Sequence, residues 1–247
     1  MLCACVILLV LSGIGGIGRH EGLKHPCSKE RTGSNPVSRT KELRPQKVVM
    51  RICLCYIDGL SPTGGTIKVE RVIMNIFVVE SDPYDAAVAL CDKHVPKMAV
   101  ESVQMLVSSL LRNGADPKDM PLTAKGAPHK GGYPNHPSTR WVGDSRSNYE
   151  WLYSHAEALV NEFRFRFGKV HACAYQLSDL IGMQCLIPEK GLTQVALCVG
   201  EKFQKGFGGS HAPLEDAIHV YREFYKFDKL AFAEWNRGRN APLWWIS

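Results

Sequence analysis

An amphipathic pattern over residues 96–112 constrains the fold more than any other stretch of this sequence. Apolar residues recur there at spacings of three and four, which is the pattern of a helix with one face on a core. The members of this stripe are Ala99, Val103, Leu106 and Leu110. Pro96 suits the first helical turn, where its missing N–H costs nothing, and Asn113-Gly114 is a typical helix end. The sequence therefore predicts one long, half-buried helix.

The opposite face of this stretch carries polar groups. Lys97, Glu101 and Gln104 follow one another at spacings of four and three, and His94 directly precedes the predicted helix. A histidine, a lysine and a carboxylate gathered at one helix end can perform acid–base or imine chemistry. Ordinary solvated helix faces show the same spacing, so spacing alone leaves both interpretations open.

Helix signals also occur on either side of this stretch. Asp82-Pro83 pairs a good N-cap with a good first helical residue, and predicts a short helix to Leu90. Ser147 and Glu150 have the spacing of a capping box, which predicts a second long helix that ends at Gly168.

The expected fold class follows from these signals. It also rests on a third predicted long helix over residues 213–234 and on a short apolar stretch at 75–79. We predict a mainly α protein, with a single compact helical domain over residues 74–247 that begins with a short extended segment. We expect Trp244-Trp245 to pack the C-terminal tail against this domain.

Residues 1–73 differ in character from the rest of the chain. They lack hydrophobic periodicity and predict a disordered or non-native head. Gly33-Ser34-Asn35-Pro36 is what the consensus T-arm of a transfer-RNA gene encodes, and residues 13–44 resemble a translated tRNA gene. The natural start would then be Met74. Because tRNA genes often lie near small enzyme genes in phage genomes, a phage source follows as an expectation.

The charge of the chain is concentrated in the same head. The formal net charge is +6, but residues 1–73 hold 11 Lys and Arg against 5 Asp and Glu, whereas residues 74–247 hold 19 of each. A global basic field for nucleic-acid binding is therefore excluded for the domain, and such binding needs a local patch. The candidate patch follows the second long helix and consists of Arg164, Arg166, Lys169 and His171.

The nine cysteines show no spacing typical of a zinc site. Cys91 and Cys198 sit in apolar runs and predict buried free thiols in a reducing compartment. The apolar run at residues 6–11 has no preceding Lys or Arg and is too short to cross a bilayer. We expect a cytoplasmic protein, in the host cytoplasm if phage-encoded, with no membrane span, no metal and no cofactor.

A Pro- and Gly-rich loop is predicted over residues 113–140, and its end is dense in hydrogen-bonding groups. Asn135, His136 and Arg140 are candidate substrate contacts there, with Trp141 directly after them. The alternative is that Asn135 and His136 only cap the next helix. Tyr149 begins an aromatic edge on the following helix, which suits either the core or a ligand platform.

Two motifs together resemble the pyrimidine-dimer DNA glycosylases of the phage endonuclease V type and their bacterial relatives. The first is Cys91-Asp92-Lys93-His94-Val95-Pro96-Lys97-Met98-Ala99-Val100-Glu101-Ser102-Val103-Gln104-Met105. The second is Gly132-Tyr133-Pro134-Asn135-His136-Pro137, followed by Trp141. Each motif is unspecific by itself, and their order and spacing carry the resemblance over about residues 74–170.

The resemblance implies a small helical fold that binds DNA containing damaged or modified pyrimidines. It implies that the α-amine of the chain attacks C1′ of the damaged nucleotide, that an imine forms, and that β-elimination then nicks the strand. Glu101 falls on the assisting glutamate and His94 on a neighbouring site residue. The amine would be that of Met74 if translation starts there, and Lys97 is the alternative imine-forming group.

The sequence departs from the family where the phage enzyme offers arginines to DNA, because Val100 and Gln104 occupy those positions. The candidate catalytic residues are Glu101, His94, Lys97 and Met74. The candidate substrate-binding residues are Gln104, Asn135, His136, Arg140, Trp141, Tyr149, Lys169 and His171. Two alternatives stay open: a phage enzyme that performs transfer chemistry on a nucleotide or modified pyrimidine, and a non-catalytic phage accessory protein. The oligomeric state is not predicted.

Overall fold

The computed structural model describes residues 74–206 and 209–247, so the predictions for residues 1–73 lie outside the described residues. The described part is mainly helical, as predicted, and its two strands have two residues each. In chain order the elements are α1 (Pro83–Ala89), α2 (His94–Arg112), η1 (Pro117–Asp119), α3 (Pro137–Asp144), α4 (Arg146–Phe167), α5 (Cys173–Asp179), η2 (Met183–Leu186), β1 (Val195–Ala196), α6 (Glu201–Gln204), β2 (His211–Ala212), α7 (Leu214–Lys229) and α8 (Leu243–Ile246).

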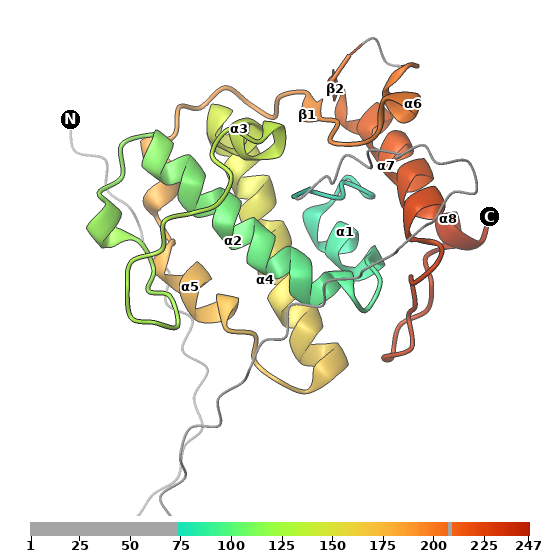
Figure 1. The fold of residues 1–247 in the computed structure, drawn as a ribbon, viewed down its shortest axis with the longest axis horizontal. Helices are drawn as coiled ribbons and strands as arrows, with labels where there is room; N and C mark the ends of the chain where they lie inside the picture. The colour runs from blue at the N-terminus through green and yellow to red at the C-terminus, as the bar shows by residue number, and fades with distance from the viewer. Residues whose placement is uncertain (1–73, 207–208) are drawn as a thin grey trace, which may run out of the picture. The chain divides into compact units, whose positions relative to one another are not determined.

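Helices α2 and α4 pack against each other at the centre of the fold (Figure 1). Helix α1 lies against α4, and α3 lies against α2 and α4. The predicted apolar stripe of α2 is buried over its whole length, from Ala99 to Leu110. Strands β1 and β2 form an antiparallel pair in which Val195 faces Ala212, and α7 packs beside them.

The N-terminal segment, residues 74–79, is buried and has no strand partner in the described structure. Buried backbone N–H and C=O groups must find partners, and here they find them within the segment and on side chains. The N–H groups of residues 78 and 79 bond the carbonyls of residues 76 and 77. The N–H of Asn75 donates to Glu101, and Arg222 Nε of α7 donates to the carbonyl of Val79 over 2.8 Å. The segment therefore lies between α2 and the C-terminal part of the chain (Figure 1).

Three helix boundaries differ from the sequence-based expectation. Helix α2 begins at His94, because the N–H groups of residues 94 and 95 both bond the carbonyl of Cys91, and Pro96 still falls in the first turn, where no intrahelical acceptor is needed. Helix α3 starts inside the predicted loop, with Pro137 as its first residue. Helix α7 ends at Lys229, five residues before the predicted end.

The predicted capping box at the start of α4 is wrong. The N-cap is Ser145, and its hydroxyl donates to the carbonyl of Gly191 over 2.7 Å instead of capping the helix. The Ser147 hydroxyl donates to Glu189 Oε1 over 2.8 Å. A tertiary partner in the segment before β1 thus replaces the local capping interaction. The predicted end at Gly168 is confirmed, with a positive φ of 65°.

The C-terminal tail packs on the domain as expected. The rings of Trp244 and Trp245 lie 5.9 and 6.1 Å from the ring of Tyr225, centroid to centroid. The predicted burial of Cys91 and Cys198 is also confirmed.

Candidate functional site

A buried carboxylate on α2 is the centre of the candidate site. The Glu101 side chain is 10% exposed, and its Oε1 lies 3.2 Å from Nζ of Lys97, whose side chain is 56% exposed. The other oxygen, Oε2, accepts the N–H of Asn75 over 3.2 Å. Burial raises the pKa of Glu101, although the charge of Lys97 and the Asn75 N–H both act to lower it. A carboxyl group whose pKa is raised by burial is suited to accept and return a proton during catalysis.

The side chain of Asn75 fixes the backbone N–H that faces Glu101. Its amide nitrogen donates to the carbonyl of Cys198 over 2.8 Å, and its Oδ1 lies 3.0 Å from the Tyr221 hydroxyl. That hydroxyl also lies 2.7 Å from the carbonyl of Ala196 and accepts the N–H of Cys198 over 3.1 Å. Residues more than 120 positions away in the sequence therefore hold the N-terminal segment at the carboxylate.

His94 is buried beside this site and belongs to an aromatic cluster. Its ring stacks on Phe77 at 4.9 Å between centroids, and its Nδ1 lies 2.7 Å from the Tyr225 hydroxyl. Burial lowers its pKa well below the usual range, and the charges of Lys229 and Lys97 lower it further. The imidazole is therefore neutral at neutral pH, and in this arrangement it joins the start of α2 to α7 and the N-terminal segment.

Met74 contributes a buried side chain, whose sulfur accepts a hydrogen bond from the Thr139 hydroxyl over 3.6 Å. The nitrogen that faces Glu101 is that of the following residue, Asn75. In the 247-residue chain the nitrogen of Met74 is a peptide amide, which is not a nucleophile. Among the described residues, the amine that contacts Glu101 is Lys97 Nζ.

The loop before α3 approaches α2 at Gln104. Gly132 packs closely there, and a Cβ at this position would lie 3.2 Å from Gln104 Cβ. His136 is the N-cap of α3, and its Nδ1 accepts the N–H of residue 138 over 3.3 Å. Asn135 and Arg140 are exposed on either side of it. The capping alternative for His136 is thus the one that its contacts support.

The aromatic candidates lie in the core. Trp141 is 3% exposed, and its Nε1 donates to the carbonyl of Thr193 over 3.4 Å. Tyr149 is 1% exposed, burial raises the pKa of its hydroxyl, and that hydroxyl has no hydrogen-bond partner among the described residues. A buried hydroxyl without a partner is costly.

The predicted basic cluster after α4 does not form one surface. The Arg166 side chain is fully buried and binds Glu162, with Nε 2.6 Å from Oε1. His171 is buried, and its Nδ1 accepts the N–H of residue 173 over 3.2 Å. Arg164 and Lys169 alone remain exposed from this group.

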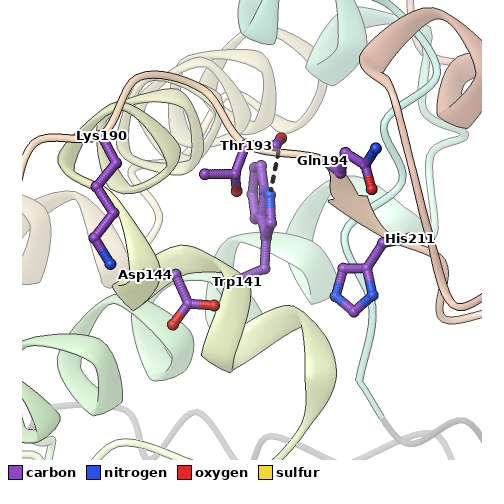
Figure 2. A pocket seen from close by; sticks show the side chains of 6 residues that line it. All are labelled: Trp141, Asp144, Lys190, Thr193, Gln194 and His211. Carbon is purple, nitrogen blue, oxygen red and sulfur yellow. Dashed lines mark hydrogen bonds between the residues drawn. The ribbon is translucent and has the colours of Figure 1, made fainter.

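Two hollows in the described part of the chain lie away from Glu101. One of about 440 Å³ is bounded by Trp141 in α3, by the segment before β1 and by β2 (Figure 2). Its lining residues are Trp141, Asp144, Lys190, Thr193, Gln194 and His211. Another of about 400 Å³ lies beside the end of α2, against residues 117–118 and 127–130. Neither is lined by a residue that binds Glu101, so the contacts of the carboxylate, and not the size of a hollow, identify the site.

Within residues 74–206 and 209–247, no group of three or more His, Cys, Asp or Glu side chains is placed to hold a metal ion. In the same residues, no helix is long and apolar enough to cross a membrane.

Three supporting residues of the site were not selected from the sequence. Asn75 is a polar residue at the start of an apolar run, and Tyr221 and Tyr225 lie four residues apart on one face of α7. The polar interruption was a usable signal for Asn75. The two tyrosines look like ordinary core residues, because only the tertiary structure shows where their hydroxyl groups point.

Comparison with protein families supports the resemblance found in the sequence. Residues 74–174 match the family model described as pyrimidine dimer DNA glycosylase. The matched segment contains Glu101 and Lys97 and ends at the start of α5, and it supports a glycosylase-like role with DNA as binding partner. Comparison with curated proteins found no match, and comparison with solved structures found none either.

Proposed function

We propose that this protein removes pyrimidine bases from damaged DNA through an imine intermediate, with Lys97 as the nucleophile and Glu101 as the proton-transfer group. The observation that carries the proposal is the contact between Glu101 and Lys97 at 3.2 Å, on a carboxyl group whose pKa is raised by burial. The family match over residues 74–174 supports the substrate class.

The steps assign one role to each group. Lys97 Nζ passes a proton to the Glu101 carboxylate, and the neutral amine attacks C1′ of the damaged nucleotide. The bond between C1′ and the pyrimidine nitrogen breaks, its electron pair leaves with the base, and the protonated Glu101 gives its proton to the departing base. The Glu101 carboxylate then takes a proton from the nitrogen now bound to C1′ and passes it to O4′. The C1′–O4′ bond breaks, its electron pair goes to O4′, and a protonated imine forms between Lys97 and C1′. Loss of a proton from C2′ then expels the 3′ phosphate by β-elimination and nicks the strand.

The hydrogen bond from Asn75 supports this assignment of roles. By donating to Oε2, the Asn75 N–H fixes one carboxylate oxygen and leaves Oε1 toward Lys97. A general base has to be held within hydrogen-bond reach of the proton that it accepts, and this pairing meets that condition.

Borohydride trapping tests the proposal, because the reagent reduces an imine to a stable covalent adduct. The substrates are duplexes that carry a thymine dimer or an abasic site. We expect a trapped adduct with the wild-type chain, its loss in Lys97→Gln, and strong loss in Glu101→Gln. Lys118→Gln, which removes an exposed lysine of η1, is the matched control and should keep full trapping.

Peptide mapping of the adduct identifies which amine is the nucleophile, independently of whether an imine forms. An adduct on Lys97 is expected, whereas an adduct on an amino terminus at residue 74 or 75 would overturn Lys97 and keep the imine. Absence of any adduct would overturn the proposal. Thermal protection of the same protein by free nucleotides would then favour a nucleotide-transfer enzyme.

A further inference from the structure

We propose that the surface where the start of α2 meets the end of α7 binds the backbone of the DNA strand that flanks the site. We call this surface the lysine face and define it by Lys93, Lys202, Lys229 and Phe227. The nucleic-acid identity of the ligand rests on the proposed function. The surface itself extends beyond the matched family segment, because α6 and α7 lie after residue 174.

Lys229 links the lysine face to the candidate site. Its ammonium lies 5.5 Å from the centroid of the Phe77 ring and 5.3 Å from that of Phe224. The Phe77 ring in turn stacks on His94, the first residue of α2. The charge of Lys229 acts on the pKa of both His94 and Glu101. A phosphate bound at Lys229 would therefore lie next to the reacting nucleotide.

An exposed aromatic ring lies farther along the same surface. Phe227 is 65% exposed, and Lys202 Nζ lies 3.0 Å from its ring centroid. Phe203, the residue after Lys202, packs edge-on against both Phe224 and Phe227. A lysine beside an exposed ring is what a single strand needs, because the cation meets a phosphate while an unpaired base stacks on the ring.

Lys93 extends the surface on the other side of the site. Its Nζ lies 5.2 Å from the centroid of the Phe232 ring, and that ring packs edge-on against His94 at 5.5 Å. Contacts between rings thus connect the three lysines across the start of α2 and the end of α7, which lie on the same side of the fold (Figure 1).

Two acidic groups on this surface are paired with lysines, whereas Glu201, the neighbour of Lys202, is exposed. Asp228 forms an ion pair with Lys229, and Glu223 pairs with Lys226. The Lys229 side chain is 16% exposed and that of Asp228 is 47% exposed, so a phosphate that approaches from solvent competes with Asp228 for Lys229. The surface also shows how a domain with equal numbers of acidic and basic residues can bind DNA, since a local patch is sufficient.

Fluorescence anisotropy against salt concentration tests the inference. The probe is a labelled single strand with a tetrahydrofuran abasic analogue, which cannot form an imine, and the protein is the full chain. Each lost phosphate contact to a single strand reduces the slope of log affinity against log salt by about 0.7. Lys202→Gln/Lys229→Gln should therefore reduce it by about 1.4. Phe227→Ala should weaken binding roughly 5- to 150-fold, and Asp228→Asn should strengthen it.

The matched control is Lys125→Gln/Lys190→Gln, which removes two exposed lysines outside the lysine face and should leave the slope unchanged. A wild-type slope in Lys202→Gln/Lys229→Gln, or equal competition by polyglutamate, would overturn the inference. Trapping on a true abasic site separates the two proposals. If Lys202→Gln/Lys229→Gln shows the expected slope change but the wild type forms no adduct, only the proposed function is overturned. If the wild type forms an adduct but the slope does not change in the variant, only the lysine face is overturned.

Discussion

Replacement of Arg166 by methionine should destabilise the protein strongly, because this guanidinium joins α4 to the connection between α1 and α2. It donates to the carbonyls of Val88 and Leu90, both over 2.8 Å, and binds Glu162 at 2.6 Å and Asp92 at 3.0 Å. The connection that it holds leads directly into the start of α2.

The magnitude follows from which partners are left unpaired by Arg166→Met. Glu162 keeps both hydrogen bonds from Arg239, and Asp92 keeps the N–H of Asn236. The carbonyls of residues 88 and 90 lose this partner, and a buried polar group left unpaired costs roughly 1–3 kcal/mol. With the broken ion pairs, we expect a loss of about 3–5 kcal/mol in the free energy of unfolding, the range typical of a broken buried pair.

Urea unfolding followed by circular dichroism measures this loss, with linear extrapolation to water. Arg164→Met is the control, because Arg164 is exposed on the same helix and its replacement should change stability by less than about 0.5 kcal/mol. A loss below about 1 kcal/mol in Arg166→Met would refute the reasoning, since the paired carbonyls would then not depend on the guanidinium.

Three further predictions concern the site. Tyr221→Phe removes a hydroxyl that bonds Asn75 and Cys198, so urea unfolding should show a loss of about 1–3 kcal/mol in the free energy of unfolding. Borohydride trapping should slow while DNA affinity stays unchanged, and an unchanged trapping rate would contradict the prediction. Because burial lowers the pKa of His94, its contribution to stability is present above the unfolded pKa of about 6.5 and falls as pH drops toward the folded pKa, so His94→Gln should flatten the acid limb of a stability–pH curve. Burial raises the pKa of Glu101, so the wild type should lose stability relative to Glu101→Gln as pH rises from the unfolded pKa of about 4.3 through the folded pKa. A stability difference between the two proteins that does not change with pH would count against this prediction.

The sequence was sufficient to predict the helical class, α1, α2 and the end of α4, because these depend on local signals such as hydrophobic periodicity and helix caps. It was not sufficient where a distant partner replaced a local one. Ser147 has capping-box spacing, yet its hydroxyl binds Glu189. Arg166 belongs to a run of basic residues, yet it is buried against Glu162.

The candidate site shows the same division. Lys97 and Glu101 lie four residues apart on one helix, so their contact could be predicted from spacing. The role of Asn75 depends on Cys198 and Tyr221, and the lysine face depends on α7 packing beside the start of α2. Pairings between residues more than 100 positions apart leave no trace in local patterns.

The hydrogen bonds that hold Asn75 in place have a consequence for the order in which the protein folds during synthesis. Asn75 is tied to Cys198 and to Tyr221, which lie 123 and 146 residues later in the chain. Contacts between such distant residues form late, since the entropy of closing a long loop must be overcome first. During synthesis, α2 and its lysine emerge well before the residues that complete the site. The nascent chain would therefore carry Lys97 and Glu101 without their final arrangement, and the reactive centre would mature only when α7 docks.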